Sequence, residues 1–208
     1  MLRTVKIALT AIFAALTIAI NLYGPKIPAP YAPFLVYQFW EIPIVVVFLT
    51  IGVAEGLAVA LINMGILLVY YPGPLLLGPI YNFIAVMSML LGVYLVYRIA
   101  TRRFSATDLS SFLRQHIKLI SVFATLAGVV LRVAVMSIVN YVALQQPPPA
   151  GYHLNSLEAI GYLPLVGAFN ASVAAYTVPI ALGIVLAAAP MTSRFVKPTT
   201  TKKKGLES

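Results

Sequence analysis

Apolar segments separated by short polar stretches run through nearly the whole chain. Four of them approach or exceed the ~20 residues that a helix needs to cross a bilayer, at 5–23, 79–99, 117–144 and 161–190. Two shorter apolar runs, 42–54 and 56–71, lie between the first and the second. This spacing predicts an all-α membrane protein with six transmembrane helices, all within one domain at 1–190.

The stretch 42–71 can form one long helix or two short ones. One helix would place Glu55 near the bilayer centre, at a cost of ~2.5–3.5 kcal/mol. Two helices would place Glu55, with Gly52 and Gly56 beside it, at a water-facing turn. The first would cover only about 20 Å at ~1.5 Å per residue, so it must be tilted, re-entrant or shielded by protein. The position of Glu55 favours two segments.

Between the first and second segments lies the connector 25–43, with the sequence PKIPAPYAPFLVYQFWEIP. Its prolines exclude a regular membrane helix, since each removes a backbone donor and clashes with the preceding turn. It is nevertheless too apolar and aromatic for a solvated loop. Two interpretations follow: a packed connector at the membrane interface, or a rigid cap over a ligand.

The composition agrees with a membrane protein, because 61% of the residues are hydrophobic and only 9% are charged, against about 25% charged in soluble chains. The net charge of +9 does not indicate nucleic acid, since the basic residues cluster between or after the apolar segments and orient the protein in the bilayer. With both termini cytoplasmic, Lys26 is the only loop cation outside. A five-segment arrangement with an external N-terminus satisfies most charges too, and Glu55 decides for six. We expect a multi-pass protein of the cell membrane, in contact with lipid.

On this topology the outer face collects three Pro-rich or aromatic stretches with almost no charge, at 25–43, 70–79 and 145–162. The inner face is plain and basic, and it includes a tail at 191–208 that we expect to be disordered. The asymmetry predicts a pocket near the extracellular side for a flat, largely neutral molecule.

Asparagines stand out among the apolar residues. Asn63, Asn140 and Asn170 fall within segments, while Asn21 and Asn82 lie near outer ends. An amide offers both donors and acceptors, which suits a heterocycle with imide or ring-nitrogen edges. For any single asparagine, an interhelical hydrogen bond worth ~0.6 kcal/mol is the favoured interpretation. For the set near the aromatic loops, Asn82, Asn140 and Asn170, ligand binding is favoured.

Arg132 lies about two helical turns from Asn140 in the fifth segment. A charge at this depth needs a partner or a wet cavity. No acid is expected at the same depth, so backbone carbonyls, water or a ligand must serve it.

Small residues form a stripe on the first segment. Ala11 and Ala15 share one helical face, and Ala8 and Ala19 extend it. Small residues at this spacing let another helix approach closely. The stripe predicts a docking surface, within the chain or for a partner.

Signatures of catalysis are missing from the sequence. It has no phosphate-binding G-x-x-x-x-G-K-[ST] loop, no H-E-x-x-H, no G-x-S-x-G serine and no cysteine. The two histidines, His116 and His153, fall on opposite membrane faces of the expected topology. We expect neither an enzyme nor a metal or cofactor site, and any ATP-derived energy must come from another subunit.

Several stretches resemble one family. They are AIFAAL in the first segment, FLVYQFWEIPIVVVFLTIGVAEGLAVALIN, GPIYNF, LRVAVMSIVNY and AFNASVAAY. Over most of 5–185 the chain resembles the substrate-binding S components of energy-coupling factor (ECF) vitamin transporters, most like the riboflavin-specific branch. The family's six-helix fold agrees with the topology reached from hydropathy.

The resemblance implies a function and a set of residues. Ala11 and Ala15 match an A-x-x-x-A motif that docks on a transmembrane T component, itself joined to two ATP-binding cassette subunits. The expected substrate-binding residues are Phe34, Leu35 and Gln38 of the connector, with Asn82, Asn140, Tyr141 and Asn170 of the helices. The implied function is capture of riboflavin from outside for an ATP-driven importer.

The chain departs from the riboflavin pattern at a few positions. Gln38 stands where the family usually has an acid, Trp40 and Glu41 replace the S-D of F-S-D-I-P, and Val173 stands where riboflavin members often have lysine. The loss of a carboxylate at Gln38 and of a lysine at Val173 makes the pocket more neutral. These departures leave an S component for another vitamin as the alternative, with a membrane scaffold that lacks a pocket as the alternative from another class.

Overall fold

The computed structural model describes residues 2–70, 75–101 and 106–192. In this part of the chain, five helices are long and apolar enough to cross a membrane. They are α1 (Arg3–Tyr23), α3 (Val53–Tyr70), α4 (Gly78–Thr101), α5 (Ala106–Gln145) and α6 (Ser156–Thr192). A sixth apolar helix, α2 (Glu41–Thr50), is shorter. The mostly helical fold is as predicted, while six spans and the orientation in the membrane stay predictions. The predicted tail lies outside the described residues from 193 on.

The break predicted near Glu55 is present between α2 and α3. Gly52 adopts a φ of 155°, a conformation that L side chains rarely adopt. Glu55 sits in the first turn of α3 and pairs with Lys6 of α1, with 3.3 Å between Lys6 Nζ and Glu55 Oε1. The α2–α3 turn therefore lies at the same end of the molecule as the N-terminus.

The short helix α2 is shielded by protein. It packs against α1, α3 and α6, and its most buried side chains belong to the central core. That core consists mainly of small and β-branched residues, with Ile44, Val45, Val47, Val59, Val86, Met89, Val93 and Val178 among the most buried. Of the three possibilities open for the first short segment, burial by neighbouring helices is the one observed.

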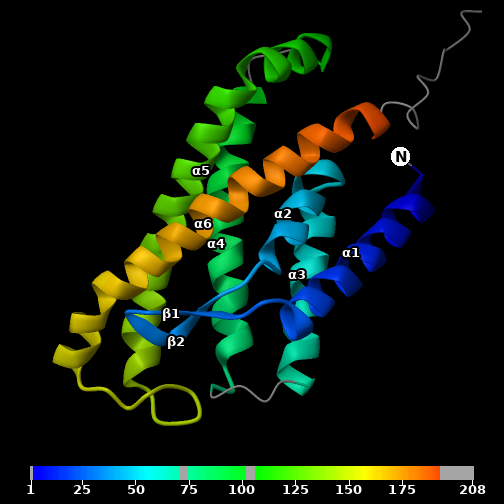
Figure 1. Cartoon of the computed structure of the whole chain (residues 1–208). Coiled ribbons are helices and arrows are strands. Elements are labelled where there is room, and N and C mark those ends of the chain that lie inside the picture. The colour runs from blue at the N-terminus through cyan, green and yellow to red at the C-terminus, as the bar shows by residue number, and fades with distance from the viewer. Residues whose placement is uncertain (1, 71–74, 102–105, 193–208) are drawn as a thin grey trace, which may run out of the picture.

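The connector is a β-hairpin, which the all-α prediction did not contain. Strand β1 (Ile27–Ala29) pairs antiparallel with β2 (Ala32–Tyr37), and Ile27 lies opposite Tyr37. Proline fixes φ and favours an extended residue before it, so the prolines that exclude a helix here are compatible with short strands. Figure 1 shows the hairpin crossing one end of the helices, between α1 on one side and α5 and α6 on the other.

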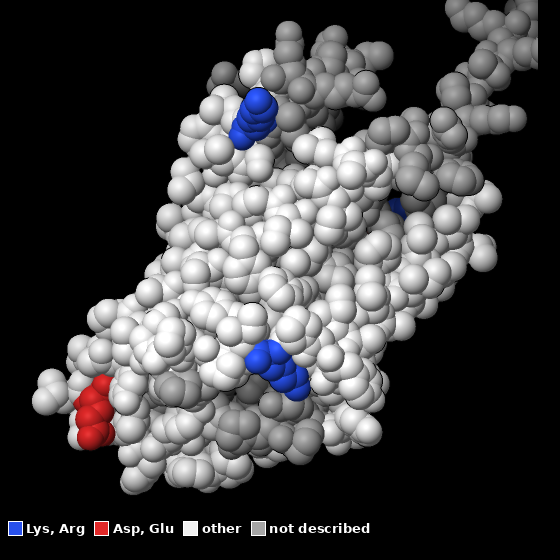
Figure 2. Space-filling model, viewed as in Figure 1, with Lys and Arg blue, Asp and Glu red and all other residues white. Residues whose placement is uncertain are grey.

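The α4–α5 pair packs closely near the middle of both helices. A Cβ on Gly92 would lie only 2.4 Å from the backbone oxygen of Ala127, so no other residue fits there without moving a helix. Small residues at such contacts are typical of membrane helices, whose association depends on close packing. The outer surface is apolar in turn, and the face in Figure 2 is almost free of charged side chains.

Candidate functional site

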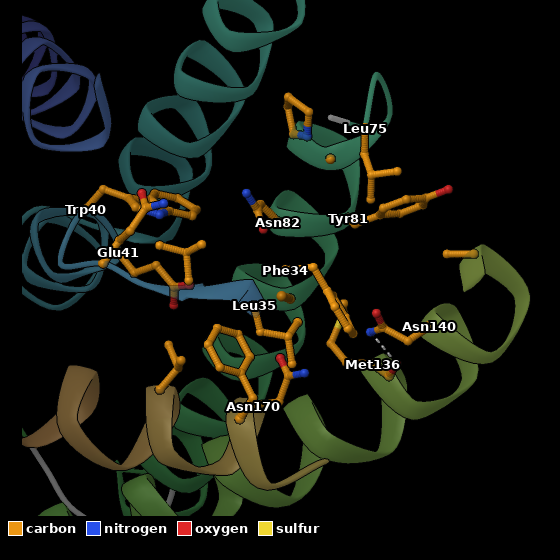
Figure 3. Close-up of a pocket in the computed structure, with 18 of the residues that line it drawn as sticks. Phe34, Leu35, Trp40, Glu41, Leu75, Tyr81, Asn82, Met136, Asn140 and Asn170 are labelled. Atoms are coloured by element: carbon orange, nitrogen blue, oxygen red, sulfur yellow. Dashed lines mark hydrogen bonds between the residues drawn. The ribbon is translucent and has the colours of Figure 1, made fainter. Parts of the chain in front are cut away.

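A cavity of about 200 Å³ lies beneath the hairpin, between β2 and the neighbouring ends of the long helices. We call it the hairpin cavity. Its wall includes Phe34, Leu35, Gln38, Trp40, Glu41, Asn82, Arg132, Met136, Asn140, Asn170 and Tyr176. Figure 3 shows labelled side chains from the hairpin, the start of α2, α4, α5 and α6 around one space. Aromatic and aliphatic groups with a few polar ones are the usual lining of a small-molecule site.

Six of the seven substrate-binding residues expected from the sequence line this one cavity. Phe34, Leu35 and Gln38 come from the connector, and Asn82, Asn140 and Asn170 come from three different helices. Tyr141, on the described part of α5, is not among the lining residues.

Five amides line the cavity, and they differ in which hydrogen-bonding groups they leave open for a ligand. Asn140 donates from Nδ2 to the carbonyl of Met136, 2.8 Å away in its own helix, and its oxygen has no partner among the described residues. Asn82 is exposed to the cavity without any hydrogen bond to a described residue. The Oε1 atom of Gln38 is buried and also has no partner in the described part of the chain. Burying an acceptor without a hydrogen-bond partner costs the free energy of its lost hydration. A hydrogen-bond donor on a ligand would offset that cost.

Arg132 pairs with Glu41, contrary to the expectation that no acid shares its depth. The guanidinium binds both carboxylate oxygens, through Nη1 to Oε2 and through Nη2 to Oε1, the latter at 2.8 Å. Both side chains are almost fully buried, at 4% and 5% exposure. The error has a physical reason: α2 has only ten residues, or about 15 Å. A helix that short, with its C-terminal turn beside Lys6, begins within the membrane rather than at its surface.

The ion pair also fixes the orientation of Asn170. Arg132 donates from Nε to Oδ1 of Asn170 at 3.0 Å, so the amide oxygen must face the guanidinium. The amide nitrogen donates to the carbonyl of Val166 at 2.9 Å, and its second hydrogen has no acceptor among the described residues. Asn170 can therefore offer a ligand an N–H donor, while its oxygen already accepts from Arg132. Glu41 at the first turn of α2 is further stabilised by the positive end of that helix.

The hairpin contacts α6 through hydrogen bonds of hydroxyl groups and through packing of aromatic rings. Tyr176 donates to the backbone carbonyl of Gln38 at 2.6 Å, and the hydroxyls of Tyr37 and Ser172 lie 2.9 Å apart. Tyr37 also packs on Phe169, with 4.8 Å between ring centroids. These contacts hold β2 over the cavity.

The hydroxyls of Tyr31 and Tyr37 share a hydrogen bond of 2.6 Å on the outer side of the hairpin. Partial burial, followed by this hydrogen bond, raises the pKa of Tyr31 to about 12. Tyr31 is therefore uncharged at physiological pH, and the cover of the cavity gains no negative charge from it.

Of the other two aromatic stretches of the sequence, 145–162 packs against the hairpin, and the described part of 70–79 bonds to 145–162. Phe34 packs against Tyr152 and Tyr162, with centroid separations of 5.3 and 5.7 Å. The backbone nitrogen of Leu76 donates to the carbonyl of Pro149 at 2.9 Å. The three Pro-rich or aromatic segments predicted to share one face thus lie together at one end of the molecule.

Asn21 and Asn63 follow the interhelical interpretation. The amide nitrogen of Asn21 on α1 lies 3.5 Å from the amide oxygen of Asn63 on α3, and both side chains are buried. Asn21 reaches the cavity wall, whereas Asn63 is not among the lining residues. This pair joins α1 to α3.

Comparison with known proteins points to a fold. No protein-family model matches the sequence, and no curated protein matches it. One similar solved structure was described as "Structure and mechanism of the S component of a bacterial ECF transporter"; it aligns with a TM-score of 0.61 over 94% of this chain and 99% of that chain, at 19% identity. The chain has the fold of an ECF S component. That neighbour is a transport subunit, not an enzyme.

The S-component fold leaves one face of α1 uncovered. Ala8, Ala11, Ala15 and Ala19 are all exposed, while Ala14 and Thr17 on the opposite side are buried. The small-residue stripe predicted for docking therefore lies on the exposed side of α1 in the described part of the chain.

Some residues of the cavity wall were not predicted as binding residues from the sequence. Trp40 and Glu41 were noted only as departures from the riboflavin pattern, and Met136 and Tyr176 carried no signal beyond their apolar or aromatic nature. For Glu41 a signal did exist, since Arg132 needed a counter-ion and few acids were available in the chain.

Proposed function

We propose that this protein is the substrate-capture subunit of an ECF-type importer, binding riboflavin or a related flat vitamin from outside. The observation that carries the proposal is a covered cavity lined by amides and aromatic rings, in a chain with the S-component fold. Isoalloxazine rings offer a large apolar surface and an edge of alternating donors and acceptors. The groups of Gln38, Asn140 and Asn170 that have no partner among the described residues would pair with such an edge.

The charge state of the cavity favours a ligand with a neutral ring system. Glu41 and Arg132 neutralise each other within the wall, and Lys26, the remaining charged lining residue, is exposed. An unpaired charge on the buried part of a ligand would find no counter-charge there and would be costly.

The size of the cavity implies movement on binding. Its volume of about 200 Å³ lies below the roughly 300–1,000 Å³ of ligand pockets. A three-ring ligand therefore requires the hairpin, with Phe34 and Leu35, to shift outward and then close again. The hairpin would act as the lid of the site.

Fluorescence of the purified protein tests the ligand assignment. Trp40, the single tryptophan, lines the cavity at 5% exposure, so a bound flavin should quench its emission. We expect saturable quenching by riboflavin and no ATPase activity. If riboflavin neither quenches nor appears by mass spectrometry among the released small molecules, the riboflavin assignment fails. Release of another vitamin would retain the transporter function with a different substrate.

Delivery of the vitamin would require docking on a T component with two ATP-binding cassette subunits, along the exposed alanine face of α1. Replacing Ala15 by leucine tests this surface. Because Ala15 is exposed, Ala15→Leu should leave folding and riboflavin binding unchanged while abolishing co-purification with the energising subunits. Leu16→Ala, an exposed neighbouring position, is the matched control.

A further inference from the structure

A second cleft, of about 300 Å³, lies between α5 and α6, far along both helices from the hairpin cavity. We call it the α5–α6 cleft. It is lined by Lys118 and Ser121 of α5 and by Pro179, Leu182, Gly183 and Leu186 of α6. It shares no lining residue with the hairpin cavity.

The wall from α6 is an apolar strip that opens outward. Its residues recur at the three- and four-residue spacing that places side chains on one helical face. A Cβ added to Gly183 would meet no heavy atom within 4 Å, and Leu186 is 46% exposed. The gap beside Gly183 is therefore not filled by another described helix, and in a bilayer a lipid chain is what lies against it.

The wall from α5 supplies a cation and a hydroxyl. Lys118 is exposed and makes no ion pair or hydrogen bond with a described residue. Ser121 lies one turn further along, on the same face of the helix. Lys118 is about 33 Å from Asn140 along α5, at ~1.5 Å per residue, which slightly exceeds the roughly 30 Å of the hydrocarbon core. With the hairpin cavity at one interface, Lys118 reaches the headgroups of the other.

The sequence around this end is strongly basic. Arg98, Arg102, Arg103 and Arg114 precede Lys118 in the sequence, and Asp108 is the one acid among them. Glu55, at the N-terminal end of the bundle, is already paired with Lys6. The charge at this end therefore favours an anionic headgroup over a zwitterionic one.

We propose that the α5–α6 cleft binds one anionic phospholipid. Its phosphate would contact the ammonium of Lys118 and the hydroxyl of Ser121, and one acyl chain would lie along Leu182, Gly183 and Leu186. Basic pockets between helices at a membrane interface recognise lipid headgroups in this way. The proposal is independent of which vitamin the hairpin cavity binds.

Two substitutions separate the headgroup contact from the acyl-chain contact. Lys118→Gln removes the charge, and Gly183→Leu fills the cleft where a side chain meets no obstacle. Arg3→Gln is the control, because it removes one exposed charge of α1 that lines neither the cleft nor the hairpin cavity. Each full-length protein in detergent is titrated with phosphatidylglycerol or with phosphatidylcholine of the same chains. Retained lipid is counted by native mass spectrometry, and unfolding temperature is measured.

We expect one phosphatidylglycerol to be retained by the wild type and to raise its unfolding temperature more than phosphatidylcholine does. Affinity for phosphatidylglycerol should fall about fivefold in Lys118→Gln, the effect of one lysine at a membrane surface, and at least as much in Gly183→Leu. Arg3→Gln should match the wild type. Wild-type affinity in both cleft variants would assign the effect to the basic face as a whole and overturn the site. Wild-type affinity in Gly183→Leu alone would overturn it too, since the lipid would not occupy the cleft.

Discussion

Two ion pairs lie at different depths of this helical bundle, and they join different parts of it. Arg132 and Glu41 are 4% and 5% exposed, share two contacts, and connect α5 to α2 in the wall of the hairpin cavity. Lys6 and Glu55 are 39% and 21% exposed, share one contact of 3.3 Å, and connect α1 to the α2–α3 turn. Both pairs join a cation to a glutamate, but one pair is buried and the other is partly exposed to solvent.

The two pairs differ in what they can contribute to stability and to the positioning of other side chains. A buried pair costs desolvation that its attraction barely repays, so an apolar pair of similar volume often serves stability equally well. An exposed pair is screened and contributes about 0–1 kcal/mol. The buried pair is thus explained better by what it positions, the amide of Asn170, than by stability alone.

Breaking the buried pair should have the largest effect. Arg132→Met leaves Glu41 buried without a counter-charge, and the free energy of unfolding should fall by about 3–5 kcal/mol. Chemical denaturation in detergent measures the loss. The double variant Arg132→Met with Glu41→Gln should recover most of it, because no isolated charge remains. A double variant as unstable as the single one would show that the loss came from packing.

The two cavity asparagines should separate binding from stability. Asn140 bonds only to its own helix, so Asn140→Ala should weaken riboflavin binding by up to about tenfold, the value of one hydrogen bond, with little change in unfolding temperature. Asn170→Ala also removes the acceptor of Arg132 and should lower both. Quenching of Trp40 and thermal unfolding report the two quantities. Equal losses of stability in both variants would instead favour a scaffold without a pocket.

Gln38 should show effects of opposite sign on stability and on binding. Its Oε1 is buried without a partner among the described residues, so Gln38→Met removes a desolvation cost. The unfolding temperature of the free protein should stay constant or rise slightly, while affinity for riboflavin should fall severalfold. Unchanged affinity would mean that Gln38 does not contact the ligand.

The exposed pair should give the smallest change. Lys6→Gln is expected to lower the free energy of unfolding by less than about 1 kcal/mol, and the difference should shrink in high salt. Denaturation of the wild type and the variant at low and at high salt concentration measures it. A larger, salt-independent loss would place this pair in the same class as Arg132 and Glu41.

The sequence predicted the helices well because hydrocarbon leaves a chain few choices. Each crossing segment must satisfy its own backbone and remain apolar, so hydropathy alone located α1, α3, α4, α5 and α6. The break at Gly52 followed from the charge of Glu55. The hairpin was not predicted. Its two strands pair where they cover one end of the helical bundle, and the composition of the connector does not indicate that arrangement.

The types of residue at the candidate site were predicted better than the contacts among them. The amides and the connector were selected correctly as neighbours because all of them belong to one end of the topology. The Arg132–Glu41 pair was missed because depth was counted as though every helix began at the membrane surface. A ten-residue helix that ends near one surface cannot begin at the other, and this was the signal to use.

The contact at Gly92 has a mechanical consequence for the hairpin cavity. Ala127, which Gly92 touches through its backbone, lies little more than one turn from Arg132 on α5, while Asn82 stands almost three turns away on α4. Two helices that meet backbone to backbone cannot approach further, but they can change their crossing angle about that point. A change of only a few degrees in the crossing angle of α4 and α5 would displace Asn82, which is far from the contact. It would leave Arg132, which is close to the contact, almost in place. We therefore expect the width of the binding site to vary at its mouth and to be constant at its base.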